Sequence, residues 1–114
     1  MDTIVHRLFD AIDTRSWERL PELFADEVVY ERPGYEPFRG LGRLDHFYRE
    51  ERVIASGRHH LDGVVVGDTQ AACWGRFVGV HRDGSAIDEG FADTYELEGG
   101  RIRHRKSFFF RPAV

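Results

Sequence analysis

The chain has 114 residues, of which 41% are hydrophobic and 32% are charged, a composition that favours one globular domain over residues 1–114 and excludes a disordered chain. The formal net charge of -4 argues against nucleic acid or an anionic membrane as a partner, and the one cysteine, Cys73, excludes an internal disulfide. The sequence contains neither a signal-peptide pattern nor an apolar run of membrane-spanning length, so we expect a cytoplasmic protein.

Two helical segments are predicted at the start of the chain. Apolar residues recur at helical spacing over residues 3–13, and Asp2 or Thr3 could cap this first helix. A second apolar stripe follows over residues 17–24. Because Pro21 lies inside this stripe, we predict two short turns, with Pro21 in the first turn of the second one.

The rest of the chain changes from helix to strand. Residues 28–30 predict a strand, residues 33–40 a loop, and residues 42–54 a third helix that ends at Ser56-Gly57. Short turns separate four later strands, which must therefore pair antiparallel: residues 59–66, 69–81, 86–97 and 101–110. This order is α+β, and the length of the strands predicts a strongly curved, mainly antiparallel sheet that holds three helices in its concavity.

The strand predicted at residues 86–97 carries carboxylates on its apolar face. Read with a period of two, that face consists of Ile87, Glu89, Phe91, Asp93, Tyr95 and Leu97. A carboxylate on a core face needs a charged partner, a proton or a wet cavity. We therefore expect a pocket wall here, with Asp93 as an acid/base group or oxyanion donor, or else as half of a structural ion pair.

Side chains of neighbouring strands are expected to share this pocket. On the second of the four strands the predicted inward face includes Trp74 and Arg76, and Arg76 would either clamp a substrate anion or neutralise Asp93. Either His59 or His60 must point inward, and we predict His60 as the proton-transferring residue. The aromatic residues of these faces predict a lining for a flat apolar ligand, with an ordinary hydrophobic core as the alternative.

Two further patterns concern partners. The six histidines lack metal-binding spacings such as HxH or HExxH, so neither a metal nor another cofactor is predicted. Phe108, Phe109 and Phe110 are consecutive and must place rings on both faces of the last strand. One face fills the cavity, and the other predicts contact with a second copy of the chain in a homodimer.

Four segments carry a family resemblance that extends over essentially the whole chain: LFADEVVYERPG, FRGLGRLDHFYRE, RHHLDGVVVGDTQAA and FADTYELEGGRIRHRKSFF. In this order they resemble the SnoaL-like branch of the nuclear transport factor 2-like superfamily, to which ketosteroid isomerase and limonene epoxide hydrolase belong. The resemblance implies a cone-shaped α+β barrel and a homodimer. It implies little about the activity, since this scaffold supports many functions.

The resemblance to ketosteroid isomerase is partial. Asp93 falls where that enzyme has its oxyanion-hole aspartate, a carboxyl kept protonated by an apolar site, which is a known case of a tuned carboxylic acid. The general-base aspartate of the isomerase falls at Arg32, and its tyrosine falls near Leu8. Steroid-type isomerisation is therefore not implied.

The other two family patterns are also incomplete. The Arg–Asp pair of the epoxide hydrolase would fall on Trp74 and Arg76, and its final-strand aspartate at Ser107, whereas Tyr30 matches its water-holding tyrosine. In the polyketide cyclases similar to SnoaL, an aspartate on the penultimate strand acts as acid and base, and Asp93 matches it best.

We therefore predict a cofactor-free acid/base enzyme of the cyclase, isomerase, dehydratase or epoxide hydrolase type that acts on a hydrophobic oxygenated small molecule. The predicted catalytic residues are Asp93, Arg76, His60 and Tyr30, and the predicted substrate-binding residues are Trp74, Phe109, Arg32, Glu89, Tyr95, Arg105 and Ser107. The alternative is a non-catalytic ligand-binding or dimerisation module on the same fold. A tightly paired Asp93 in a closed cavity would favour this alternative.

Overall fold

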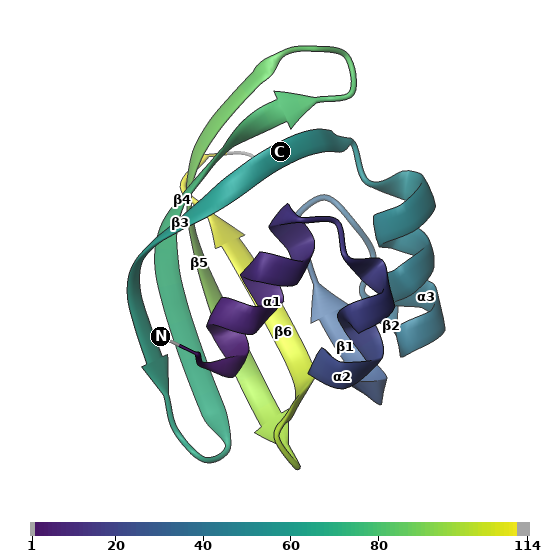
Figure 1. The fold of residues 1–114 in the computed structure, drawn as a ribbon, viewed down its shortest axis with the longest axis vertical. Coiled ribbons are helices and arrows are strands. Elements are labelled where there is room, and N and C mark those ends of the chain that lie inside the picture. The colour runs from purple at the N-terminus through teal and green to yellow at the C-terminus, as the bar shows by residue number, and fades with distance from the viewer. Residues whose placement is uncertain (1, 112–114) are drawn as a thin grey trace.

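The computed structural model describes residues 2–111 and shows helices packed against one face of a curved sheet (Figure 1). The elements in chain order are α1 (Ile4–Asp13), η1 (Trp17–Arg19), α2 (Leu20–Leu23), β1 (Phe24–Glu31), β2 (Phe38–Arg39), α3 (Leu41–His46), η2 (Phe47–Glu51), β3 (Ile54–Val66), β4 (Gln70–His81), β5 (Ala86–Glu98) and β6 (Arg101–Phe109). No helix in this part of the chain is long and apolar enough to cross a membrane.

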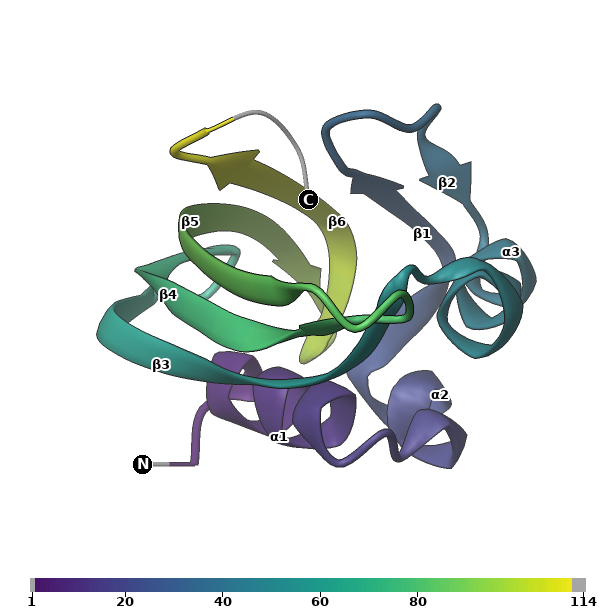
Figure 2. The same cartoon turned by 90° about the horizontal axis from the view of Figure 1, so that it is seen from above.

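The six strands form one sheet in the order β2-β1-β6-β5-β4-β3. β1 pairs parallel with β6, and the other neighbouring strands pair antiparallel. Figure 2 shows how the sheet bends around the space next to α1, with α2 and α3 beside β1 and β2. The predicted α+β class and the curved, mainly antiparallel sheet are confirmed.

The first two helical predictions agree with the structure. Thr3 caps α1, since its hydroxyl accepts a hydrogen bond from the backbone N of His6 at 3.2 Å. Pro21 lies at the start of α2, after the separate turn η1. The apolar side chains of α1, η1 and α2 are buried in the core. These helices therefore cover part of the concave face of the sheet.

The third helix is shorter than predicted. It ends at Glu51 in a π-helical turn, η2, and Ile54 begins β3 instead of continuing the helix to residue 54. Val53 and Ile54 are β-branched, which favours extended backbone at this point. As a result Arg52 lies between helix and strand, at the rim of the concave side.

The face of β4 that points into the cavity is opposite to the predicted one. Across the β4–β5 ladder Cys73 is the partner of Asp93, so these two residues share a face, whereas Trp74 is opposite Ala92. Trp74 is 47% exposed and the Arg76 side chain 62% exposed. The prediction that both residues line the pocket is therefore wrong, because the strand was assigned to the sheet with the wrong alternation.

Two glycines explain why the concave face of β4 is hard to recognise. A Cβ on Gly75 would lie 2.0 Å from the carbonyl oxygen of His60, and one on Gly79 would lie 2.4 Å from that of Ser56. The pairing of β3 with β4 also shifts register twice, so β3 bends closely over its neighbour. The close backbone excludes side chains from these two positions, so Phe77 is the one large apolar residue on the concave face of β4, whereas Trp74, Val78 and Val80 are exposed on the convex side.

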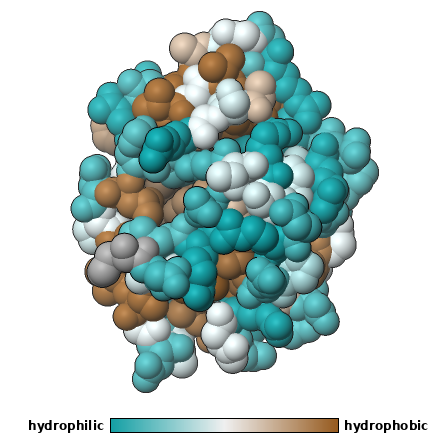
Figure 3. Space-filling model, in the orientation of Figure 1, coloured by the Kyte–Doolittle hydropathy of each residue, from teal (hydrophilic) through white to brown (hydrophobic). Residues whose placement is uncertain are grey.

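The face that carries the helices is mostly hydrophilic. Figure 3 shows this surface in the orientation of Figure 1, with hydrophobic residues at the top, where the β4–β5 hairpin lies, and along the left and lower left of the view. The convex side of the sheet instead exposes several large apolar side chains, including Trp74, Val78 and Phe108.

Candidate active site

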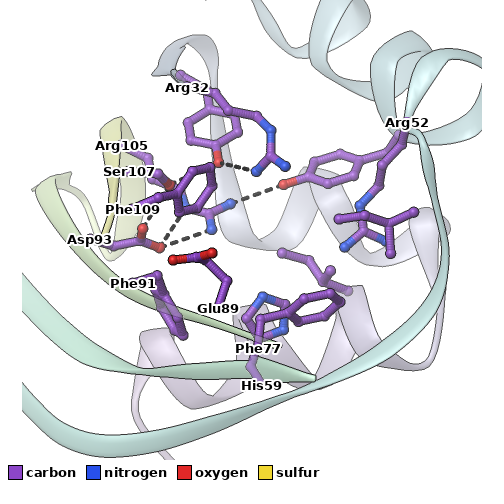
Figure 4. Close-up of a pocket in the computed structure, with 14 residues that line it drawn as sticks. Arg32, Arg52, His59, Phe77, Glu89, Phe91, Asp93, Arg105, Ser107 and Phe109 are labelled. Carbon is purple, nitrogen blue, oxygen red and sulfur yellow. Dashed lines mark hydrogen bonds and ion pairs between the residues drawn. The ribbon is translucent and has the colours of Figure 1, made fainter. Parts of the chain in front are cut away.

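A pocket lies between the concave face of the sheet, the end of α1 and the segment around η2 (Figure 4). Its lining residues are Ile12, Tyr30, Arg32, Tyr48, Arg52, Ile54, His59, Phe77, Glu89, Phe91, Asp93, Arg105, Ser107 and Phe109. The total empty space among these residues is about 480 Å³, which includes the opening to solvent and the narrow gaps between side chains. The part of it that a water molecule can occupy is about 30 Å³. Such a cavity accommodates one or two water molecules, so side chains of the lining must move to admit a larger ligand.

Asp93 is held by protein donors on both of its oxygens. Its Oδ2 accepts from Arg105 Nε at 2.9 Å and Nη2 at 2.8 Å, and from the Tyr95 hydroxyl at 2.8 Å, while Oδ1 accepts from Ser107 Oγ at 2.6 Å. Asp93 is 1% exposed and Arg105 4%. The ion-pair partner of Asp93 is therefore Arg105 and not the predicted Arg76, and its lone pairs are engaged within the protein.

The electrostatics of this pair agree with its geometry. Burial is the largest single effect and lowers the pKa of the Arg105 guanidinium, but the charge of Asp93 and the neighbouring tyrosine hydroxyls together raise that pKa well above its ordinary value. Burial, followed by the charge of Asp93, raises the pKa of the Tyr95 hydroxyl. Tyr95 donates to Asp93 but is not part of the pocket lining described above, which corrects the prediction that it lines the pocket.

A chain of hydroxyl groups continues from this pair towards Arg32. Since Ser107 donates its proton to Asp93, the hydrogen bond of 2.8 Å between Ser107 and Tyr30 must be donated by Tyr30. The Tyr30 oxygen in turn accepts from Arg32 Nη1 at 3.4 Å. The proton of Tyr30 is thus already used inside the protein.

Tyr48 has a different role in the same network. Its oxygen accepts a hydrogen bond from Arg105 Nη1 at 2.9 Å, and no acceptor for its own proton is found within residues 2–111. Burial raises the pKa of Tyr48, so the phenol stays protonated at neutral pH. The hydroxyl is polarised by Arg105 and is available as a hydrogen-bond donor to a ligand.

His59, and not the predicted His60, is the histidine of the pocket. His60 is exposed on the other face of β3, because successive residues of a strand alternate. The His59 ring contacts Phe9, Phe77 and Phe91, with ring centroids 4.3, 4.6 and 5.4 Å away. Its position follows from the register of β3, which the sequence left open between the two histidines.

Asp13, at the end of α1, orients the His59 ring. Asp13 Oδ1 lies 2.6 Å from His59 Nδ1, and Oδ2 accepts from the His59 backbone N at 2.9 Å. Burial lowers the pKa of His59, and the bond to Asp13 offsets this only in part. At neutral pH the ring is therefore neutral, with its proton on Nδ1 towards Asp13 and a basic Nε2.

Arg52 and Glu89 complete the charged lining. Arg52 is 6% exposed, and burial lowers its pKa to about 10. No carboxylate of the described chain lies within ion-pair distance of Arg52. Glu89 is bound on both oxygens by Arg111, through its backbone N and its Nε, each at 3.1 Å. Glu89 and Asp93 both line the pocket, and Figure 4 draws both side chains.

The structure thus keeps part of the predicted site and replaces the rest. The predicted residues that do line the pocket are Asp93, Tyr30, Arg32, Glu89, Arg105, Ser107 and Phe109. Arg76 instead forms an ion pair with Asp88 on the convex side, with Nη2 3.0 Å from Oδ2. Arg52, Tyr48 and Asp13 were not predicted as site residues, because all three fall at ordinary positions of the predicted helices.

Comparison with protein families gives one match. The family model of the SnoaL-like domain matches residues 5–105. The chain belongs to the SnoaL-like domain family. No curated protein matches this SnoaL-like chain significantly.

Solved structures show the same fold at low sequence identity. An NTF2-like protein of unknown function from Burkholderia pseudomallei is 18% identical, with a TM-score of 0.84 over 93% of this chain and 87% of that one. A LEH-like epoxide hydrolase of M. tuberculosis is 15% identical, with a TM-score of 0.81 over 93% and 79%. A candidate SnoaL-like polyketide cyclase from Jannaschia is also 15% identical, with a TM-score of 0.80 over 94% and 83%. At these identities the likeness shows the fold alone.

The chemistry available to this SnoaL-like protein follows from its lining. A neutral imidazole supplies a base, the Tyr48 hydroxyl a hydrogen-bond donor, and Arg52 a positive charge. Within residues 2–111, no group of three or more metal-binding side chains is placed to hold an ion.

Proposed function

We propose that this SnoaL-like protein is an enzyme that performs cofactor-free acid/base chemistry on a small oxygenated molecule, with His59 as the general base. The observation that carries the proposal is the Asp13–His59 pair in the pocket wall, at 2.6 Å. A carboxylate that fixes the tautomer and orientation of a neutral imidazole is a common way to prepare a base. Asp93, which we predicted as the acid/base group, instead holds Arg105 in place.

The proposed step is removal of a proton next to a carbonyl group. His59 Nε2 takes the proton, and the negative charge moves to the carbonyl oxygen, where Tyr48 donates a hydrogen bond. Cyclases, isomerases and dehydratases share this step. Epoxide opening, the activity named for the M. tuberculosis neighbour, would use the same base to activate a water molecule.

Deuterium exchange tests this step without knowledge of the natural substrate. The wild-type protein in D2O should accelerate exchange of the protons next to the carbonyl in small ketones and 2-oxo acids, measured by proton NMR. His59→Gln should lose this acceleration by about a hundredfold or more, since a general base contributes on that order.

His60→Gln is the matched control, because His60 lies next to His59 in the sequence but outside the pocket. It should exchange at the wild-type rate. An unchanged rate in folded His59→Gln, or no acceleration by the wild type for any probe, would rule out His59 as the base.

A non-catalytic binding module is the second candidate. It is favoured by the complete engagement of the Asp93 oxygens and by the small free cavity of about 30 Å³. In that case ligands would bind and His59→Gln would leave both binding and exchange unchanged.

We also propose a homodimer through the convex side of the sheet, as expected from the sequence. Trp74 and Phe108 expose apolar surface there, and the neighbouring Arg76–Asp88 pair carries no net charge to repel a second copy. Light scattering at micromolar concentration should give twice the chain mass, and Trp74→Glu should reduce it to one chain. A monomeric wild type would contradict the proposal.

A further inference from the structure

The charges that line the pocket do not balance. The two carboxylates of the lining are already paired, Asp93 with Arg105 and Glu89 with Arg111. Arg52 is 6% exposed, which means that 94% of its surface is buried. None of the ion pairs within residues 2–111 includes Arg52. The interior therefore carries a positive charge for which the described chain supplies no carboxylate.

The surroundings of Arg52 add to this charge. The charged groups that shift its pKa include Arg32 and Arg15, both of which lower it, while the phenols of Tyr48 and Tyr30 act in the opposite direction. The guanidinium also lies over the Tyr48 ring, with its carbon 5.8 Å from the ring centre. An uncompensated buried charge is costly, so a bound anion is the natural counter-ion.

We propose that the pocket binds a small organic carboxylate and that Arg52 is the residue that anchors it. A guanidinium offers two parallel N–H donors that match the two oxygens of a carboxylate. Ile12, Ile54 and Phe77 line the same pocket and provide apolar surface for the rest of the ligand. Because the free cavity is about 30 Å³, aromatic side chains of the lining must move when such a ligand binds.

This inference names the substrate class of the proposed enzyme, and it also has a consequence for the base. The positive charges of Arg105 and Arg52 both lower the pKa of His59, and Asp13 raises it. A carboxylate bound to Arg52 would cancel one of the lowering charges. The substrate would thus make His59 a stronger base when it binds, which couples binding to reaction.

Binding of simple acids and their amides tests the anchor directly. Acetate, propionate and benzoate are titrated into the protein, each beside its neutral amide, and binding is followed by amide chemical shifts in NMR. The wild type should bind the carboxylates at least about tenfold more tightly than the amides, as expected for a charge-assisted pair. Arg52→Gln should abolish this preference, whereas Arg101→Gln, at an exposed position of β6, should retain it.

The outcomes separate this inference from the proposed function. Equal binding of acids and amides by the wild type, or a preserved preference in Arg52→Gln, would overturn the anchor, as would the absence of binding by every probe. Binding with the expected preference but no deuterium exchange would retain the carboxylate site and remove the enzyme. Since removal of an unpaired buried charge should not unfold the protein, Arg52→Gln is expected to give a dispersed, folded spectrum.

Discussion

Two arginines in the same pocket are buried to nearly the same extent but differ in their partners. Arg105 is 4% exposed, makes one hydrogen bond and a second ion-pair contact to Asp93 and one hydrogen bond to Tyr48, and its pKa is raised. Arg52 is 6% exposed, has no carboxylate partner in the described chain, and its pKa is lowered to about 10. Burial alone therefore does not tell a structural charge from a ligand-binding one. The presence of a counter-charge in the protein does.

The largest effect on this comparison should come from removing the paired arginine. Arg105→Gln leaves Asp93 buried without its cation, which should lower the free energy of unfolding by about 3–5 kcal/mol. Urea denaturation measures this loss. The double variant with Asp93→Asn should recover part of it, because no buried charge then remains. A loss below about 1 kcal/mol in Arg105→Gln would mean that the pair contributes little.

For Arg52, which has no carboxylate partner in the described chain, we expect substitution to leave the free energy of unfolding unchanged or to raise it. Arg52→Met keeps most of the side-chain volume and removes a buried charge, so the free energy of unfolding should stay constant or rise by about 1–2 kcal/mol. The same urea series measures it. A decrease comparable to that of Arg105→Gln would show that Arg52 has a structural partner.

His59 should make stability depend on pH. Its pKa in the folded protein is lowered below the ordinary value of 6.5, so below about pH 6.5 the unfolded chain binds a proton that the folded protein does not. The free energy of unfolding should therefore fall as the pH decreases from about 7 to 5, by about 1.4 kcal/mol for each unit of the shift. His59→Gln should lose this component and His60→Gln should keep it. Parallel curves for the two variants would contradict the lowered pKa.

The smallest effect is expected at Arg76. This arginine is paired with Asp88, but the pair lies in solvent on the convex side, where long side chains gain little from pairing. Arg76→Gln, introduced into the monomeric Trp74→Glu variant, should leave the urea midpoint of that variant unchanged within error. A clear decrease would show that exposure, too, is a poor guide to the contribution of a charge.

The order of elements was predictable because it depends on local patterns. Helical spacing in residues 3–13, Pro21 at a helix start and the short turns between the later strands all act over a few residues. The inward face of β4 was not predictable in this way. Both of its faces carry apolar side chains, and Gly75 and Gly79 are required by contacts with β3, a strand that is distant in the sequence at these points.

The candidate site was predicted in part for the same reason. Asp93 was recognised as a carboxylate on a core face, and Arg105 as a residue of its surroundings, but their pairing depends on the register between β5 and β6. Arg52 carried no signal, because it was assigned to the third helix. Its place in the pocket results from the early end of that helix at Glu51. Whether His59 or His60 faces the pocket depends on the alternation of β3, which a shift of one residue would reverse.

The parallel pairing of β1 with β6 has a consequence for biosynthesis. β6 leaves the ribosome after the other five strands of this sheet, yet it lies between β1 and β5. Until it is made, the sheet remains in two parts, and both β1 and β5 present open edges that can pair with other chains. The pocket also lacks Arg105 and Ser107 during that time. A nascent chain of this protein therefore depends on β6 to close both edges and complete the pocket, and a product that lacks β6 is expected to aggregate.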